Sequence, residues 1–236
     1  MFRFQQFSVA HARSTMKVGT DGVLLGAWAE TQSAKNILDI GTGCGLIALM
    51  AAQRTPAAHI TAIDIDQASI DEARENFLAS PFATRLQALH TDIQTFSKQP
   101  DTIQYDCILS NPPFFTESLL SPNPTRAAAR SVEGGLSFST LIESAVRLLA
   151  PGGSLQIILP YQEASSVLGI AIGAGLHLLR RTDVTTKYAK PPRRTLLHWT
   201  NEATSAPILH DQLCLTDKNG GRSDSYQMLT KDFYLR

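Results

Sequence analysis

The fold is decided by residues 36–50, which read NILDIGTGCGLIALM. Residues 36–40 are typical of a buried strand, and the apolar run from Leu46 predicts a helix. Between them lies the pattern D-x-G-x-G-x-G, from Asp39 to Gly45. Glycines allow tight turns and close approach of a ligand to the backbone, and the helix start supplies N–H groups. This strand–loop–helix unit predicts a nucleotide-like ligand, with contacts at Gly41, Gly43 and Gly45.

The spacing of the loop disfavours a dinucleotide-dependent oxidoreductase. The dinucleotide pattern G-x-G-x-x-G would place its third glycine at position 46, which is Leu46. The acid at Asp39 would repel a phosphate, whereas it suits an ammonium or sulfonium group. Nineteen residues after the loop, Asp64 ends the next predicted strand, where an acid accepts hydrogen bonds from ribose hydroxyls. Asp66 is instead expected to cap the following helix.

Short apolar runs alternate with helical patterns along the chain. Strands are predicted at 36–40, 60–64, 87–89, 105–110, 155–159, around 175–181, 195–199 and 212–216, and helices at 46–53, 68–78, 139–149, 167–174 and 226–233. Polar side chains of the second helix, including Glu72, are expected to face water. This order predicts a Rossmann-like α/β fold, with a seven-stranded, mostly parallel sheet and helices on both faces. We expect one domain, 1–236, with a leader at 1–34, a core at 35–200 and a C-terminal strand and helix at 201–236.

Composition limits the classes of protein. The chain has 236 residues, 43% of them hydrophobic and 18% charged, which suits a globular protein with a sizeable core. No apolar stretch approaches the roughly 20 residues that a membrane helix needs. The start of the chain lacks the pattern of a secretory signal, and three widely spaced cysteines suit neither a disulfide framework nor a zinc site. We expect a cytoplasmic protein that binds neither a membrane nor a metal.

The sequence Asn111-Pro112-Pro113-Phe114 follows the predicted strand at 105–110. Two prolines fix the direction of the backbone carbonyls. The same four residues taken alone are also compatible with a proline turn that has no functional role. Asn111 Oδ1 and the Pro112 carbonyl are two acceptors that can hold the protons of a planar amino group, and Phe114 can stack on a purine. An amine held this way needs no strong general base. We therefore expect Asn111, Pro112 and Phe114 to be catalytic.

These motifs resemble a known family. The glycine loop resembles motif I of class I S-adenosylmethionine-dependent methyltransferases, and Asn111–Phe114 resembles the [D/N/S]-P-P-[Y/F] motif of enzymes that methylate amino groups. With the Phe-rich leader, residues 17–28 and the terminal Asp-Phe-Tyr-Leu-Arg, the whole chain resembles the bacterial tRNA(Val) adenine N6-methyltransferase family, which modifies adenosine 37. Phe114 stands where many relatives carry Tyr, so any role of a phenolic hydroxyl is lost.

The resemblance implies further contacts with S-adenosylmethionine. Asp92 occupies the place after the third strand where family members bind the adenine amino group, and Ile65 and Ile93 follow the two acids directly. Lys17, Thr20 and Asp21 lie in the segment that closes over the methionine end. For the last two residues, a capped helix starting at Thr20 or Asp21 explains the sequence equally well. Asn111 would contact both cofactor and substrate.

The chain has no net charge, with 21 Lys and Arg against 21 Asp and Glu, but its basic residues are clustered in a few segments of the sequence. Residues 180–194 hold six bases and one acid around Tyr188, which suits phosphate contacts and stacking on RNA, although most such runs are solvated loops. The candidate RNA-binding residues are Arg126, Arg130, Lys187, Tyr188, Lys190, Arg193 and Arg194.

The resemblance implies a tRNA substrate and a monomer or weak dimer. The alternatives left open are methylation of rRNA guanine N2, DNA adenine N6 or a protein glutamine, and a non-catalytic RNA-binding scaffold. The glutamine alternative gives no role to the basic residues 180–194.

Overall fold

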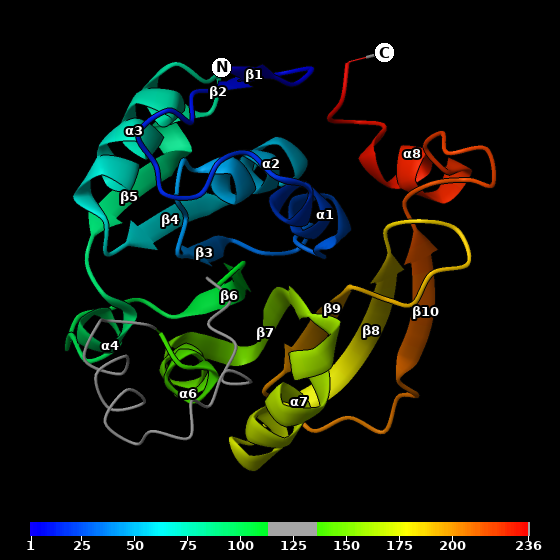
Figure 1. Cartoon of the computed structure of the whole chain (residues 1–236). Helices are drawn as coiled ribbons and strands as arrows, with labels where there is room; N and C mark the ends of the chain where they lie inside the picture. The colour runs from blue at the N-terminus through cyan, green and yellow to red at the C-terminus, as the bar shows by residue number, and fades with distance from the viewer. Residues whose placement is uncertain (113–135, 236) are drawn as a thin grey trace, which may run out of the picture.

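A computed structural model describes residues 1–112 and 136–235 of the chain. It has three layers, with one large sheet between two layers of helices (Figure 1). The strands of this sheet are β3 (Asn36–Ile40), β4 (His59–Asp64), β5 (Leu86–His90), β6 (Tyr105–Ser110), β7 (Leu149–Pro160), β8 (His177–Thr185), β9 (Arg194–Thr200) and β10 (Leu209–Cys214). Their order is β10-β8-β9-β7-β6-β3-β4-β5. Only β9 runs antiparallel to its neighbours, β7 and β8, so the described sheet is mostly parallel.

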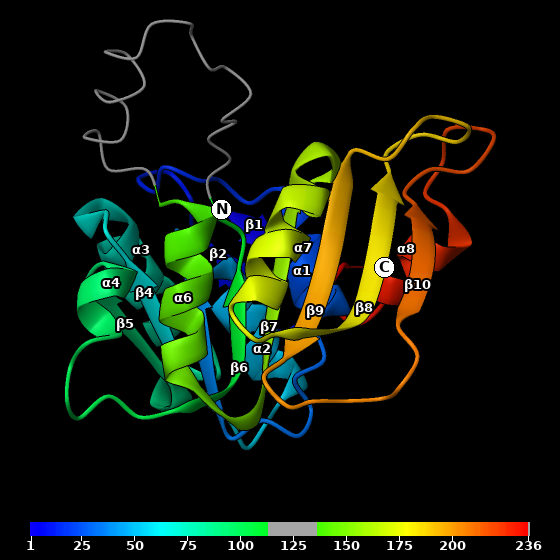
Figure 2. The same ribbon diagram turned by 90° about the horizontal axis from the view of Figure 1, so that it is seen from below.

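Helices cover both faces of the sheet. Among the described residues, the helices are α1 (Thr20–Trp28), α2 (Leu46–Arg54), α3 (Gln67–Leu78), α4 (Ile93–Phe96), α6 (Phe138–Leu148), α7 (Ala164–Gly173) and α8 (Asp224–Thr230), with 3-10 turns at Ala83–Arg85 and Tyr161–Glu163. Helices α1, α2 and α3 lie on one face with α8, and α4, α6 and α7 lie on the other, as Figure 2 shows from below. The α/β architecture predicted from the sequence is confirmed.

The sheet separates two hydrophobic cores, one on each of its faces. Successive side chains of a strand point to opposite faces. In β3, Ile37 therefore packs with α1 and α2, whereas Leu38 and Ile40 pack with α6 and α7. Asp39 shares the face of Ile37 and lies beneath the start of α2, where Ala48 contacts it. This alternation explains why a carboxylate is fully buried next to the glycine loop.

The predicted number of strands is wrong, because the large sheet has eight described strands and not seven. The segment around 212–216 was expected outside the core, but β10 pairs in parallel with β8 from Leu209 to Cys214. Its sequence, LHDQLC, buries only Leu213, so it lacks the apolar pattern of an inner strand. Polar contacts hold it instead: Asp211 accepts a hydrogen bond from Arg180 at 2.8 Å and another from Thr182.

The two ends of the chain meet on the α1–α3 side of the molecule (Figure 1). Short strands β1 (Phe2–Arg3) and β2 (Ser8–Val9), absent from the prediction, form a hairpin. The side-chain amide of Gln5 donates to the carbonyls of Lys231 and Tyr234, both at 2.7 Å. Phe4 stacks between Phe7 and Tyr234, with ring centroids 4.7 and 6.0 Å away. The leader is therefore built into the fold.

The prediction for Glu72 is also wrong. Glu72 of α3 is only 1% exposed, because the leader lies over that side of the helix. Helical periodicity identifies a polar residue but does not show the segment that covers it. In contrast, Asp66 caps α3 as predicted, since its carboxylate accepts a hydrogen bond from Ser69 N at 2.9 Å.

Candidate active site

The glycine loop turns sharply between β3 and α2. Gly41, Gly43 and Gly45 have φ values of +70°, +54° and +83°, a region that other residues rarely adopt. Gly45 also has no room for a side chain, because a Cβ would lie 2.5 Å from the Phe77 ring of α3. The N–H groups of Gly41 and Thr42 donate to the Ile63 carbonyl at 2.9 and 3.1 Å. The loop is thus fixed against β4 and α3.

Asp64 ends β4 and joins it to the loop. One carboxylate oxygen accepts a hydrogen bond from Gly43 N at 2.8 Å, and the other accepts one from Asp66 N at 2.9 Å. The side chain of Asp64 is half-buried and does not cap α3, since Asp66 does so. Asp64 is therefore still available for a ligand contact on these grounds.

Asp39 lies beneath the loop and is fully buried. Its Oδ2 accepts hydrogen bonds from Thr42 Oγ1 at 2.6 Å and from Ala48 N at 3.2 Å. Its Oδ1 has no hydrogen-bond partner among the described residues. Burial, with a smaller contribution from the charge of Asp64, raises the pKa of Asp39 to about 7, although the bonds from Thr42 and Ala48 oppose the shift. Asp39 therefore holds the loop in place, and the oxygen without a partner among the described residues makes a nearby cation favourable.

A pocket of about 280 Å³ opens beside the loop, close to the roughly 300 Å³ at which small-molecule sites begin. Its walls come from the leader, the start of α1, the glycine loop and the end of β6. They are Met16, Lys17, Gly19, Thr20, Asp21, Gly22, Gly41, Thr42, Cys44, Leu46, Ile47 and Asn111. The structure therefore brings Lys17, Thr20, Asp21, Gly41 and Asn111 together, although the sequence separates them by up to 94 positions (111 − 17).

Asn111 follows β6 at the edge of this pocket and is 7% exposed. Its Oδ1 is buried and has no hydrogen-bond partner among the described residues. The preceding Ser110 donates from Oγ to the Ile40 carbonyl at 2.8 Å, which holds the end of β6 against the start of the glycine loop. An unpartnered buried acceptor is costly unless a ligand supplies its donor. Pro112 is buried beside Asn111, whereas Phe114 lies outside the described residues.

Helix α1 begins at Thr20, as the helical alternative predicted, and Gly19 is its N-cap without a side-chain hydrogen bond. Thr20 is exposed and lines the pocket. Asp21 lines the pocket as well, and its Oδ2 accepts a hydrogen bond from Arg194 Nε at 2.7 Å. Arg194, expected to contact RNA, is thus an ion-pair partner of a pocket residue, because it begins β9 and not a free loop.

The remaining residues expected to contact the cofactor do not line this pocket. Asp92 caps α4 by accepting a hydrogen bond from Thr95 at 2.8 Å, and the bonds from Thr95 lower its pKa. The Ile93 side chain is buried in the core on the α4 face. Ile65 is 61% exposed after β4, and its carbonyl oxygen lies 2.9 Å from His90 Nε2. Asp64 and Ile65 nevertheless lie at the end of β4, and Asp92 lies just beyond the end of the neighbouring parallel strand β5.

The basic run 180–194 divides into two parts. Arg180 and Arg181 belong to β8 and pair with Asp211 and Asp183, with N–O distances of 2.8 and 2.9 Å. These two arginines therefore stabilise the sheet, although their position in the sequence suggested that they belong to the basic loop. The loop itself, residues 186–193, is exposed at Lys187, Tyr188, Lys190 and Arg193. Arg126 and Arg130 lie outside the described residues.

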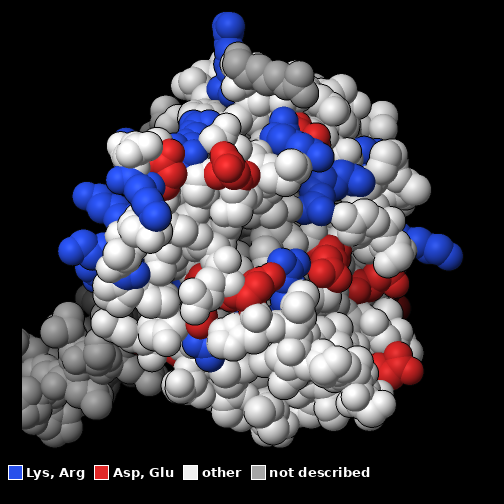
Figure 3. Space-filling model, turned by 90° about the vertical axis from the view of Figure 1, so that its right-hand side faces the viewer, with Lys and Arg blue, Asp and Glu red and all other residues white. Residues whose placement is uncertain are grey.

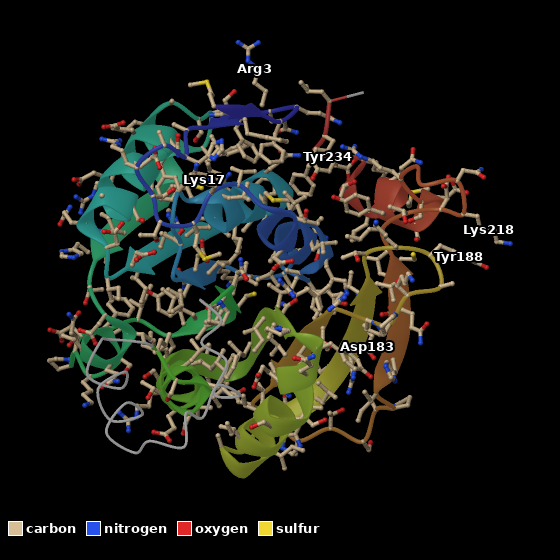
Figure 4. All side chains as sticks on the ribbon, viewed as in Figure 1. Arg3, Lys17, Asp183, Tyr188, Lys218 and Tyr234 are labelled. Carbon is tan, nitrogen blue, oxygen red and sulfur yellow. The ribbon has the colours of Figure 1, made fainter. Side chains whose placement is uncertain are left out.

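Sequence reasoning missed one residue beside this loop. Lys218 Nζ lies 5.4 Å from the centroid of the Tyr188 ring, and the two side chains point toward each other in Figure 4. They meet because Leu215, which follows β10, donates from its N–H to the carbonyl of Thr185 at 2.9 Å. On the face that carries β10 and α8, Lys and Arg gather in the upper part of Figure 3, above a band where acids and bases alternate. No spacing in the sequence indicated this contact.

Comparison with known proteins defines the class. The family model described as "Methyltransferase small domain" matches residues 8–174. A crystal structure described as a predicted O-methyltransferase from Agrobacterium tumefaciens has a TM-score of 0.71 at 19% identity, covering 90% of this chain and 96% of that one. TrmN from Thermus thermophilus has a TM-score of 0.51 at 22% identity, covering 75% of this chain and 46% of that one. The fold is that of a class I methyltransferase.

Curated relatives narrow the class to one family. A protein from Phocaeicola vulgatus is 45% identical over 99% of this chain and 97% of its own length, and one from Bacteroides fragilis is 41% identical over 100% and 98%. Both are named tRNA1(Val) (adenine(37)-N6)-methyltransferase. The chain belongs to the tRNA1(Val) (adenine(37)-N6)-methyltransferase family.

Proposed function

We propose that the protein methylates N6 of adenosine 37 in tRNA1(Val), with S-adenosylmethionine as the methyl donor. Relatives that carry this name match the chain over its full length. Within the structure, the observation that carries the proposal is Asn111, which lines the pocket beside the glycine loop and whose buried Oδ1 has no hydrogen-bond partner among the described residues. We expect the enzyme to act in the cytoplasm as a monomer or weak dimer.

The residues of the site fit S-adenosylmethionine. When bound, this cofactor supplies an electrophilic methyl group on a sulfonium. Asp21 lines the pocket with a carboxylate, and the carboxylate of Asp39 is buried beneath the glycine loop beside it, which suits a ligand with cationic groups. Lys17 lines the same pocket and would hold the ligand carboxylate, while Thr20 would line that end. Asp64 would hold the ribose hydroxyls.

The adenine end of the cofactor would extend beyond the 280 Å³ pocket toward the ends of β4 and β5. Ile65 is exposed there and offers an apolar surface, and Asp92 lies after the next strand. The side chain of Ile93 is buried, so a contact at this position would come from its backbone. We keep Asp64, Ile65, Asp92 and Ile93 as proposed contacts on this basis.

Asn111 and Pro112 would hold the amino group that is methylated. The lone pair of an exocyclic amine is delocalised into its ring, so the amine is a weak nucleophile. Acceptors at Asn111 Oδ1 and at the Pro112 carbonyl would bind its two protons and favour a pyramidal nitrogen. Phe114, directly after the rigid Pro112-Pro113 pair, would stack on the base. Positioning of the two reactants then supplies much of the rate.

The tRNA would contact the exposed loop 186–193. Lys187, Lys190 and Arg193 offer positive charge to phosphates, and Tyr188 offers a ring. We propose Arg126 and Arg130 as further RNA contacts because they follow the Asn111–Phe114 motif in the sequence. Base-specific enzymes enter single-stranded loops, where a base can be splayed out, and the anticodon loop is such a substrate.

The choice among substrates is tested by transfer of a tritiated methyl group. Unmodified total tRNA, rRNA, double-stranded DNA and a release factor are each incubated with the protein and S-adenosylmethionine. We expect label in tRNA alone, recovered as N6-methyladenosine. Label in rRNA guanine, in DNA adenine or in a glutamine would replace this proposal with one of the alternatives, and no transfer to any substrate would favour a scaffold.

A further inference from the structure

A single buried carboxylate binds three consecutive N–H groups of the leader. Glu72 Oε1 accepts from Ala12 N at 2.8 Å and from Arg13 N at 3.1 Å, and its Oε2 accepts from Ser14 N at 2.9 Å. Burial by itself would raise the pKa of Glu72, but the bonds from these N–H groups outweigh it and lower the pKa. Glu72 is thus charged at neutral pH and bonded to the leader backbone.

Asn76, one turn further along α3, binds the leader and the glycine loop together. Its Oδ1 accepts from Ala10 N, and its Nδ2 donates to the Ala10 carbonyl, both at 2.8 Å. The same Nδ2 donates to the Cys44 carbonyl at 2.8 Å. Asn76 is 4% exposed, so these bonds are shielded from water. One amide therefore fixes the leader relative to the loop.

The bound leader continues directly into the pocket wall. Ser14, held by Glu72, donates from Oγ to the Met16 carbonyl at 3.1 Å. A Cβ on Gly43 would lie 3.6 Å from that carbonyl, so the leader crosses closely over the glycine loop. Met16 and Lys17 then line the pocket, and Figure 4 places Lys17 on the leader near α2.

We propose that Glu72 and Asn76 are positioning residues that hold leader residues 10–17 as a preformed wall of the cofactor pocket, before RNA binds. The inference rests on the proposed function only in taking S-adenosylmethionine as the ligand. It assigns α3 a role in cofactor affinity through contacts with the leader backbone, not through contact with the ligand. Three hydrogen bonds from backbone N–H groups to one buried carboxylate hold the leader firmly, because a hydrogen bond to a charged group is stronger than one between neutral groups.

A neighbouring carboxylate provides a matched control. Glu75 lies on the same helix and pairs with Arg13 Nη2 at 2.5 Å, but both side chains are exposed, 64% and 46%. Exposed ion pairs contribute little to stability, and this one does not hold the leader backbone. Glu75→Ala therefore removes a contact with the same leader residue while leaving the proposed wall in place.

The test compares Glu72→Gln, Glu72→Ala, Asn76→Ala and Glu75→Ala with the wild type. Titration calorimetry gives the Kd for S-adenosylmethionine, and amide exchange reports on residues 10–17. For Glu72→Gln we expect a Kd increase of about tenfold and faster exchange at 12–14, since an amide keeps one acceptor oxygen and turns a donor toward an N–H. Steady-state kinetics should show a higher KM for the cofactor with little change in kcat.

The outcomes separate positioning from a purely structural role. Glu75→Ala should leave Kd and exchange as in the wild type. Faster exchange or a lower Tm in Glu72→Gln with an unchanged Kd would overturn the inference, and this conservative variant decides the matter if the alanine variants do not fold. Failure of the wild type to bind S-adenosylmethionine would instead refute the proposed function. Equal binding of S-adenosylmethionine by the wild type and Glu72→Gln would refute this inference and leave the proposed function intact.

Discussion

Arg194 Nε lies 2.7 Å from Asp21 Oδ2, so a residue expected to bind RNA is paired with a residue of the cofactor pocket. The two side chains are 32% and 24% exposed, which places the pair at the rim of the pocket. Arg194 begins β9 directly after the exposed basic loop 186–193. The pair therefore joins the proposed RNA surface to the start of α1.

Replacing Arg194 should affect cofactor binding more than replacing its neighbour. Arg194→Gln leaves Asp21 without its cation, and because the pair is partly solvated we expect only a few-fold change in the Kd for S-adenosylmethionine, on the order of 1 kcal/mol or less. Arg193→Gln, one residue away and exposed, is the control and should leave this Kd unchanged. Calorimetry on both variants checks the assignment, which fails if Arg194→Gln binds as the wild type does.

Removing the acceptor at Asn111 should separate binding from turnover. Asn111→Ala keeps the glycine loop and Asp64, so the Kd for S-adenosylmethionine should change little. Loss of a preorganised hydrogen-bonding group at the reacting centre typically costs about 10²–10³ in kcat. Single-turnover methylation and calorimetry measure the two effects. A variant with normal turnover would show that Asn111 does not hold the amine.

Asp39 should make the stability of the ligand-free protein depend on pH. Burial raises its pKa from 3.8 to about 7, so between these values the folded state binds a proton that the unfolded state has lost. The stabilisation linked to that proton is full below pH 3.8 and is lost as pH rises through 7. Relative to Asp39→Asn, the wild type should lose up to about 1.4 kcal/mol of unfolding free energy per pH unit in this window.

Urea unfolding at several pH values measures this difference. The Asp39→Asn variant is a suitable reference because its side-chain oxygen can still accept a hydrogen bond from Thr42. A constant difference between the two proteins from pH 4 to 7 would mean that Asp39 titrates normally in the folded state.

The loop 186–193 should determine how RNA affinity depends on salt. Each phosphate contact removed should lower the slope of log K against log salt by about 1, so Lys187→Gln with Lys190→Gln should lower it by about 2. Arg180→Gln with Arg181→Gln is a control of equal charge change, because these arginines pair with Asp211 and Asp183 in the sheet. An unchanged slope in the loop variant would show that the RNA docks elsewhere.

The sequence predicted the parts of the fold that local patterns specify. The D-x-G-x-G-x-G loop indicated β3 and α2 on either side of it, and Asp66 was identified as the cap of α3, because both features depend on neighbouring residues. The strand predicted at 212–216 was assigned outside the core, because contacts of β10 with β8, and not its own apolar residues, hold it in the sheet.

The site was predictable only in part, because some of its contacts join segments that are far apart in the sequence. Gly41, Asp21 and Asn111 were chosen from motifs, and the structure brings them to one pocket. Glu72 was missed because its partners are backbone groups 58 or more positions away, which no side-chain pattern records. Arg194 was assigned to the RNA surface because a run of bases in the sequence does not show which of them have acidic partners.

The most direct test of the proposed function is the position of the methyl group on tRNA. An unmodified tRNA1(Val) transcript and a variant with guanosine at position 37 are incubated with the wild-type protein and S-adenosylmethionine, then digested for nucleoside mass spectrometry. We predict one N6-methyladenosine per molecule of the first transcript, none in the second, and almost none in either with Asn111→Ala. Equal methylation of both transcripts, or a different methylated nucleoside, would contradict it.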